Sequence, residues 1–221
     1  MLEGTSLMKY MTPVILPAIF DTIKMVFVSA VLSITLGLAI GIVLVLTEPG
    51  GLKPNKTAHA VLGKITDIVR SFPTIVLIVA VAPLTRVLIG TTIGIKAAIF
   101  AITLACTPFA ARVTENAFHT VDPLLIEAAK SFGATRSQIV TKVMFVEALP
   151  HLVANYTLMV INMLNASAVA GAVGAGGLGA VALTYGYQRF DYPVMYCVVA
   201  ILIIFVLQIQ NFGQHMYDKL K

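Results

Sequence analysis

The glycine run around residue 175 has a spacing that can bind a phosphate group. Gly174, Gly176 and Gly179 match the Gly-x-Gly-x-x-Gly fingerprint of dinucleotide-binding sites. That fingerprint requires a preceding β-strand and an acidic residue about 20 positions further on. Here the run ends a long apolar segment, and neither condition is met. We therefore interpret these glycines as a place of close helix packing or of a bend at membrane level.

The other candidates for chemistry also lack the spacing that catalysis or metal binding requires. The pair Gly63-Lys64 is not a nucleotide phosphate loop, because Ile65 follows the lysine and Ala58 stands where the first glycine belongs. A Gly-x-Ser-x-Gly nucleophile elbow is missing. Four histidines are scattered without metal-ligand spacing: His59, His119, His151 and His215. We predict no catalytic residue, no metal site and no cofactor bound by this chain.

The composition places the chain in a membrane. Hydrophobic residues make up 58% of the 221 residues and charged residues only 11%, whereas a soluble domain carries about 25% charged residues. The net charge of +5 could indicate a nucleic-acid partner. The basic residues flank apolar runs, however, so we predict membrane lipid and no nucleic acid as a partner. Cys106 and Cys197 both lie inside apolar runs, and we interpret them as small core residues.

The apolar runs predict an all-α membrane protein with a single transmembrane domain over residues 1–221. A spanning helix needs roughly 20 apolar residues, and the first run is too long for the apolar region of a cleaved signal peptide. The runs 71–85 and 97–111 are shorter, so their flanking basic residues must lie near a membrane interface. The five predicted spans are about 14–47, 57–86, 92–118, 148–172 and 192–215.

The distribution of basic residues predicts the orientation of these spans. Ten lysines and arginines lie near the loops after spans one and three and in the C-terminal tail, and four lie on the opposite side. Positive residues concentrate on the cytoplasmic side of a membrane. We therefore predict an N-terminus outside, a cytoplasmic C-terminus, and a charged cytoplasmic loop at about 120–147.

Span two carries several local signals. Thr57 is expected to cap its first turn, and Pro73 and Pro83 are expected to kink it. Asp67 and Arg70 are three residues apart, so they can form an ion pair near the cytoplasmic end of the span. Ordinary interfacial charges would have the same spacing, and both interpretations stay open here.

Two helix faces are expected to pack within the membrane. Gly37 and Gly41 form a Gly-x-x-x-Gly pair, which allows two helices to approach closely. In span four, four residues share one helical face: Asn155, Asn162, Asn165 and Val169. Amides that face lipid are costly. This face therefore either makes hydrogen bonds between helices, worth about 0.6 kcal/mol each, or lines a translocation route at a dimer axis.

The charged loop between spans three and four has the pattern of two short helices. Asp122 can cap the first helix with Pro123 at its first position. Gly133 stands where a left-handed residue would end that helix. Thr135 and Gln138 have the spacing of a capping box for the second helix. A helix, a sharp turn and a second helix could dock a soluble partner or could be an ordinary connector.

The residues Glu127-Ala128-Ala129, followed after three residues by Gly133, resemble the conserved loop of permease subunits of bacterial ABC importers. In that family the loop forms the coupling helix, which sits in a groove of the cytoplasmic ATPase. Further segments resemble the methionine permeases of the family, and the likeness covers nearly the whole chain from residue 14. These segments are 70–73, 83–86, 90–94, 108–112 with Glu115 and Asn116, and 171–179.

This resemblance implies a type I ABC importer permease fold in the bacterial inner membrane. The implied partners are a second copy of the chain, two cytoplasmic ATPase subunits that bind ATP and Mg²⁺, and an extracytoplasmic substrate-binding lipoprotein. The chain itself would not be an enzyme, and its substrate would be D- or L-methionine. The implied ATPase-coupling residues are Glu127, Ala128, Ala129, Gly133 and Ala134. The resemblance implies Val169 as a gate residue, and together with Asn162 and Asn165 of the same helical face it forms the predicted pathway.

The chain departs from the family pattern in two places. The segment 143–146 stands where the family loop often has Ile-x-Leu-Pro, which puts the turn into span four in doubt. Val169 is smaller than the bulky residue with which methionine permeases help to close the pathway. Other functions stay open: a permease for another small amino acid or sulfur compound, a stand-alone secondary transporter or channel, or a membrane-bound enzyme. Secondary transporters typically show internal repeats and carboxylates deep within spans, and neither pattern is found in the sequence.

Overall fold

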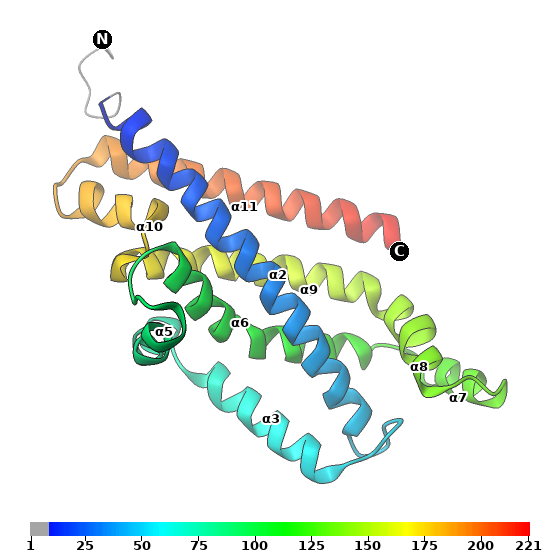
Figure 1. The fold of residues 1–221 in the computed structure, drawn as a ribbon. Coiled ribbons are helices and arrows are strands. Elements are labelled where there is room, and N and C mark those ends of the chain that lie inside the picture. Colours follow the sequence, from blue (N-terminus) through cyan, green and yellow to red (C-terminus); the bar gives the residue numbers. More distant parts are fainter. Residues whose placement is uncertain (1–8) are drawn as a thin grey trace. The chain divides into compact units, whose positions relative to one another are not determined.

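The computed structural model describes residues 9–221, and every regular element within them is helical (Figure 1). The all-α class predicted from the sequence is therefore confirmed. In chain order the elements are η1 (Met11–Ile15), α2 (Leu16–Thr47), α3 (Lys56–Ser71), α4 (Thr74–Ala80), α5 (Ala82–Ile89), α6 (Ile95–Phe118), α7 (Pro123–Ser131), α8 (Arg136–Gln138), η2 (Ile139–Met144), α9 (Phe145–Ala170), η3 (Gly171–Ala175), α10 (Gly177–Val181), η4 (Ala182–Tyr187) and α11 (Tyr192–Leu220). The η elements are π-helical turns that continue or join α-helices.

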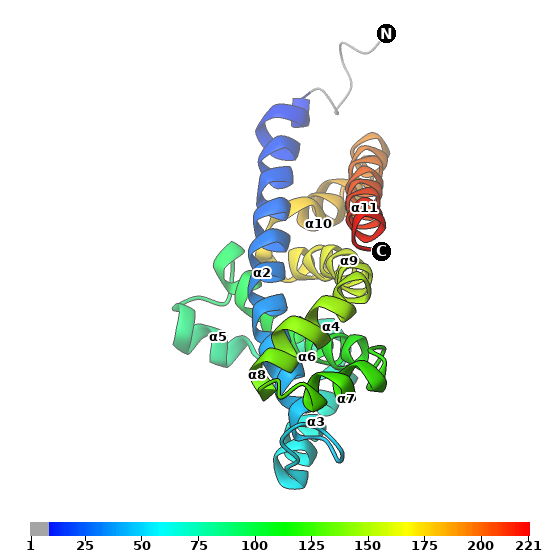
Figure 2. The ribbon, with the colours of Figure 1, turned by 90° about the vertical axis from the view of Figure 1, so that its right-hand side faces the viewer.

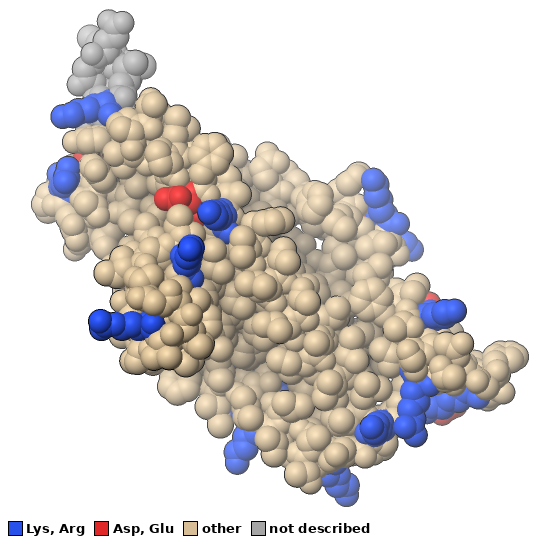
Figure 3. Space-filling view, viewed as in Figure 1, with Lys and Arg blue, Asp and Glu red and all other residues tan. Residues whose placement is uncertain are grey.

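Four helical stretches within residues 9–221 are long and apolar enough to cross a membrane. They are Met11–Thr47, Ile95–Phe118, Arg136–Ala175 and Tyr192–Leu220. These stretches overlap predicted spans one, three, four and five. The fourth begins at Arg136, inside the segment predicted as a loop, because α8 and η2 continue into α9. Figure 3 shows one face of the molecule, on which lysines and arginines are scattered over a surface made mostly of other residues.

The second predicted span is not one continuous helix. Residues 56–89 form three helices, α3, α4 and α5, each too short to count as a span. The first break lies at Pro73, which has φ −56° and ψ 135° and caps α4 from outside the helix. A proline lacks the N–H that would continue the helix, and it disfavours helical geometry in the residue before it. Pro83 lies in the first turn of α5, so it begins a helix instead of kinking one.

The helix cap predicted at Thr57 was also wrong. Helix α3 begins at Lys56, two residues earlier than a cap at Thr57 would allow. The side chain of Asn55 accepts a hydrogen bond from the amide of Ala58 at 3.1 Å, which is the geometry of an N-cap. Asparagine is as good a cap as threonine or better, so a shift of two residues needs no other explanation.

Residues 9–221 divide into two compact units, which we call the first and the second unit. The first comprises 9–33, 72–106 and 160–209, and the second comprises 34–71, 107–159 and 210–221. Each of the long helices α2, α6, α9 and α11 contributes residues to both units. The predicted single transmembrane domain stays a prediction.

The first unit is built on apolar and small-residue packing. Its core includes Ile15, Leu178 and Val194, which are fully buried. The glycine run breaks the helix here, since Gly174, Gly176 and Gly177 all have positive φ. The same run packs closely: a Cβ on Gly179 would lie 2.3 Å from the carbonyl oxygen of Ala168. The interpretation of these glycines as a bend and a close packing site is thus confirmed.

The second unit contains the Gly-x-x-x-Gly pair. A Cβ on Gly37 would lie 2.2 Å from that of Ala110, and a Cβ on Gly41 would lie 2.4 Å from that of Thr114. Helices α2 and α6 therefore touch along these glycines, as predicted from their spacing. The neighbouring core cluster joins the ends of α2 and α6 to the start of α9, and includes Val45, Phe118, Val121, Ile139, Met144 and Leu152.

Candidate functional site

The loop between α6 and α9 begins with a capped helix. The Oδ1 atom of Asp122 accepts a hydrogen bond from the amide of Leu124 at 2.9 Å, and Asp122 has extended backbone angles. Pro123 occupies the first turn of α7, where the missing N–H costs nothing. The start of α7 predicted from the sequence is confirmed.

The turn at Gly133 also has the predicted conformation. Gly133 has φ +77°, the left-handed region, and its amide donates to the Lys130 carbonyl at 2.9 Å. The amide of Ala134 donates to the Ala129 carbonyl at 3.0 Å, which is the 6→1 hydrogen bond of a Schellman motif at a helix C-terminus. A Cβ on Gly133 would find no atom within 4 Å. Space is therefore not the reason for glycine here; backbone conformation is.

The second helix of the loop begins with the predicted capping box. The Gln138 amide donates to Oγ1 of Thr135 at 3.3 Å, and the Thr135 amide donates to Oε1 of Gln138 at 2.8 Å. Helix α8 then passes through η2 into α9 (Figures 1 and 2). Both ends of the loop are thus closed by side-chain hydrogen bonds, which gives this segment one defined backbone conformation.

The loop has an inner and an outer face. Ala129 and Ala134 pack against the core cluster of the second unit, whereas Glu127 and Ala128 are exposed. The two alanines of the Glu-Ala-Ala motif therefore differ: Ala129 packs against the core, and Ala128 is exposed. Only Ala128 leaves room for close contact with another molecule.

The outer face carries apolar side chains that the sequence reasoning missed. Phe132 is 91% exposed, Leu124 is 69% exposed and Leu125 is 42% exposed. Large apolar side chains with this much exposure, in a loop that is otherwise polar, are typical of a protein interaction surface. The signal available in the sequence was four large apolar residues among the charges of 122–136: Leu124, Leu125, Ile126 and Phe132.

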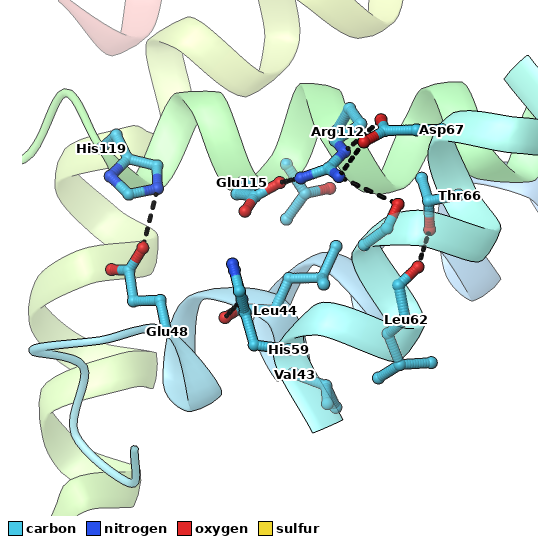
Figure 4. A network of polar contacts seen from close by, with 12 residues as sticks. Val43, Leu44, Glu48, His59, Leu62, Thr66, Asp67, Arg112, Glu115 and His119 are labelled. Carbon is cyan, nitrogen blue, oxygen red and sulfur yellow. Dashed lines mark hydrogen bonds and ion pairs between the residues drawn. The ribbon is translucent and has the colours of Figure 1, made fainter. Parts of the chain in front are cut away.

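A charged network joins α3 to α6 within the second unit (Figure 4). The guanidinium of Arg112 donates to both carboxylate oxygens of Asp67, at 3.1 Å from Nε and 2.8 Å from Nη2. Nη2 also donates to the carbonyl of Gly63 at 3.0 Å, and Nη1 donates to Oε2 of Glu115 at 2.5 Å. Asp67, for which Arg70 was one possible partner, is bound by Arg112 from another helix.

A contact between a histidine and a carboxylate lies next to this network. His119 Nε2 lies 3.2 Å from Oε2 of Glu48, which follows α2 (Figure 4). Glu48, Glu115 and His119 each place a potential ligand atom within 4.8 Å of the others. Tertiary structure thus brings Glu48 close to Glu115 and His119, which lie far along the chain from it. In the described structure, Glu115 is engaged by Arg112 and Glu48 by His119.

The proposed pathway residues lie along α9. Asn162 and Asn165 are exposed, and Val169 is half-buried. The side chain of Asn155 donates to the carbonyl of His151 at 2.9 Å, one turn earlier in the same helix. Asn162, Asn165 and Val169 belong to the first unit. Their role in a pathway stays a prediction.

The chain is similar to known membrane transport proteins over almost all of its length. The profile described as "Binding-protein-dependent transport system inner membrane component" matches residues 37–218. A probable D-methionine transport system permease protein of Vibrio cholerae is 41% identical over 90% of this chain and 88% of its own length. A methionine import system permease protein of Bacillus subtilis is 39% identical over 77% of both chains.

A solved structure has the same fold. It is an inward facing conformation of the methionine ABC transporter MetNI, and its matching chain is 40% identical with a TM-score of 0.93. The match covers 96% of this chain and 98% of that chain. An amino acid ABC transporter at 20% identity, with a TM-score of 0.80, shares the fold as well. The chain belongs to the family of binding-protein-dependent transport system inner membrane components.

Proposed function

We propose that this chain is the membrane-spanning subunit of an ATP-driven importer of methionine in the bacterial inner membrane. The observation that carries the proposal is the 40% identity and TM-score of 0.93 to a chain of a methionine ABC transporter. The loop between α6 and α9 supports it, because its fixed turn and exposed apolar side chains are suited to docking a soluble partner.

The docked partner is an ATPase, which binds and hydrolyses ATP with Mg²⁺ on its own chain. Glu127, Ala128 and Gly133 present and shape the coupling helix, while Ala129 and Ala134 hold it against the second unit. Phe132 and Leu124 supply apolar area for the contact. Aromatic side chains that become buried at an interface often contribute most of its binding energy.

The helices α3, α4 and α5 together make the second of five membrane crossings. They cover residues 56–89, and a broken helix is tolerated at membrane depth where it is buried in protein or lines a cavity. Five crossings place the two termini on opposite sides of the membrane. The excess of lysine and arginine near the loops after spans one and three supports a cytoplasmic C-terminus and an N-terminus outside.

The permease works as a homodimer. Five helices are too few to surround an amino acid and also to gate it at both ends, and two-fold symmetry is the usual solution for a membrane subunit with two identical partners. The exposed amides of Asn162 and Asn165, with Val169, lie on the part of α9 that faces the dimer axis and the route.

Transport follows from relative movement of these parts. ATP closes the paired ATPases, the two coupling helices move together, and the membrane helices change from inward-open to outward-open by rigid-body motion. An extracytoplasmic binding protein then delivers methionine, and hydrolysis resets the cycle. The binding protein contributes much of the selectivity, so the same permease could also serve another small amino acid or sulfur compound.

A test of the proposal is uptake of radiolabelled methionine in a strain that lacks this chain and has no other methionine importer. The wild-type chain should restore uptake, and Gly133→Val should not, because a β-branched residue is strained at φ +77°. Gly133→Asn is the matched control, since asparagine tolerates the left-handed region. Full uptake with Gly133→Val would contradict the coupling role of the loop.

The alternative of a stand-alone secondary transporter predicts a different result. Affinity purification should recover an ATPase subunit with the wild-type chain, and replacing Phe132 with Asp should weaken that association without loss of the permease. If the purified chain alone moved methionine across liposomes without ATP, the importer proposal would be wrong.

A further inference from the structure

The segment around Arg112 resembles methionine permeases in sequence but has no place in the coupling loop or the pathway. Within the structure, Arg112 uses all three of its guanidinium nitrogens. The bonds to Asp67 are bidentate, and the bonds to Gly63 and Glu115 use the remaining directions of the fork. Lysine could not reproduce this pattern, because its ammonium is a point charge without a planar fork.

Two of the charged side chains in this network, those of Arg112 and Glu115, are largely buried. The side chain of Arg112 is 19% exposed and that of Glu115 only 8%, while Asp67 is 55% exposed. A carboxylate as buried as Glu115 needs its cationic partner. Arg112 is thus held to its own helix by Glu115, and from there it reaches across to α3.

A glycine makes room for the contact. A Cβ at Gly63 would lie 3.1 Å from Nη2 of Arg112, closer than ordinary van der Waals contact. The carbonyl of the same residue accepts a hydrogen bond from that nitrogen. Gly63 therefore has two roles: its carbonyl accepts a hydrogen bond, and its lack of a side chain lets the guanidinium approach the backbone of α3.

The network connects the first helix of the broken crossing, α3, to the end of α6 that precedes the coupling loop. Glu115 is one turn from Phe118, where α6 ends before the loop, and α3 runs from the network to the break at Pro73. Helices α3 and α6 are thus joined by charge-assisted hydrogen bonds close to the point where the coupling loop begins. Such bonds are short and directional.

We propose that Arg112 is a positioning residue that makes α3 move together with α6, so that displacement of the coupling loop reaches the second crossing. This inference rests on the proposed function. Arg112 touches no substrate, and its contribution is to the coupling between ATP hydrolysis and transport. Removing it allows α6 to move while α3 lags, and ATP is then hydrolysed without import.

The test uses the complete importer: this chain with its ATPase and binding protein, reconstituted in liposomes. Three variants weaken the network in different ways: Arg112→Lys, Asp67→Asn and Gly63→Val. The quantity measured is methionine imported per ATP hydrolysed. We expect this ratio to fall about 2- to 30-fold in each variant, the range of single coupling residues, while ATPase activity persists.

Two controls separate coupling from a merely structural role. Ala60→Val, a small-to-valine change on the exposed side of α3, should keep the wild-type ratio. Asp67→Glu should retain most of it, because the exposed carboxylate can still reach Arg112. A structural role alone would lower import and hydrolysis together and leave their ratio constant, which would overturn the inference. So would equal losses in Asp67→Glu and Asp67→Asn.

The outcomes also separate this inference from the proposed function. If the wild-type complex shows no ATP-dependent import of methionine, the proposed function fails. If the wild type couples and the three variants couple equally well, the proposed function stands and the role of Arg112 is refuted.

Discussion

The two compact units of the described chain are stabilised by different chemistry. In the first, hydroxyl groups bond to backbone: Thr22 accepts from the amide of Leu178 at 2.9 Å, and Ser29 donates to the carbonyl of Ile99 at 3.3 Å. Close contacts at glycines occur in both units, at Gly179 in the first and at Gly37 in the second. In the second, charged side chains also join the helices, as Arg112 does between α3 and α6.

This difference follows the cost of burying charge. Charged groups inside a membrane are expensive unless paired, so close packing and hydroxyl bonds are a less costly way to join helices there. A unit that carries a polar loop can use ion pairs at its helix ends. Ion pairs are directional and connect particular residues, which suits the transmission of movement that we propose for the second unit, whereas small-residue packing suits a bend of fixed shape.

The largest effect is expected from removing the central charge of the second unit. Arg112→Ala leaves Glu115 buried without its partner, which should lower the free energy of unfolding by about 3–5 kcal/mol. Denaturant titration of the purified protein in detergent measures the change. Arg136→Ala, at an exposed position, is the control and should have little effect. Equal stability of both variants would mean that the charges do not hold this unit.

The corresponding change in the first unit is steric. Gly179→Val places a side chain against the backbone of Ala168 and should cost about 1–3 kcal/mol. The same titration applies, with Ala172→Val as the matched control, because Ala172 is exposed. A stable Gly179→Val variant would contradict close packing as the basis of the bend.

A smaller effect is expected from the hydroxyl bonds. Thr22→Val keeps the volume but leaves the buried amide of Leu178 without its acceptor, at a cost of about 1–2 kcal/mol. Thr66→Val is the control: its hydroxyl bonds only to Leu62 in its own helix, so stability should change less. If Thr66→Val were the more harmful change, hydroxyl bonds between distant segments would not matter in the first unit.

The smallest effect is local to the coupling loop. Thr135→Ala removes one half of the capping box and should cost about 1 kcal/mol or less in global stability. Hydrogen exchange should show faster opening of the amides of α8 and η2, while those of α6 keep their protection. Uniform loss of protection across the second unit would show that the loop is not an independent element.

The features that the sequence predicts well depend on neighbours within a few residues. Asp122, Gly133 and the Thr135–Gln138 pair all have the predicted geometry, because a cap or a left-handed turn is decided by local backbone hydrogen bonds. Long apolar runs are equally local, and four of the five predicted spans are long helices. The sequence alone therefore determined the helical class and the conformation of the loop between α6 and α9.

The remaining features depend on residues that are far apart in the chain. Asp67 has a possible partner three residues away but binds Arg112, because packing of α3 on α6 offers a better bidentate geometry. Tertiary packing also decided that Ala129 faces the core while Ala128 and Phe132 face outward. Spacing along one helix cannot say which helix will lie opposite, and that choice is made only when the chain packs.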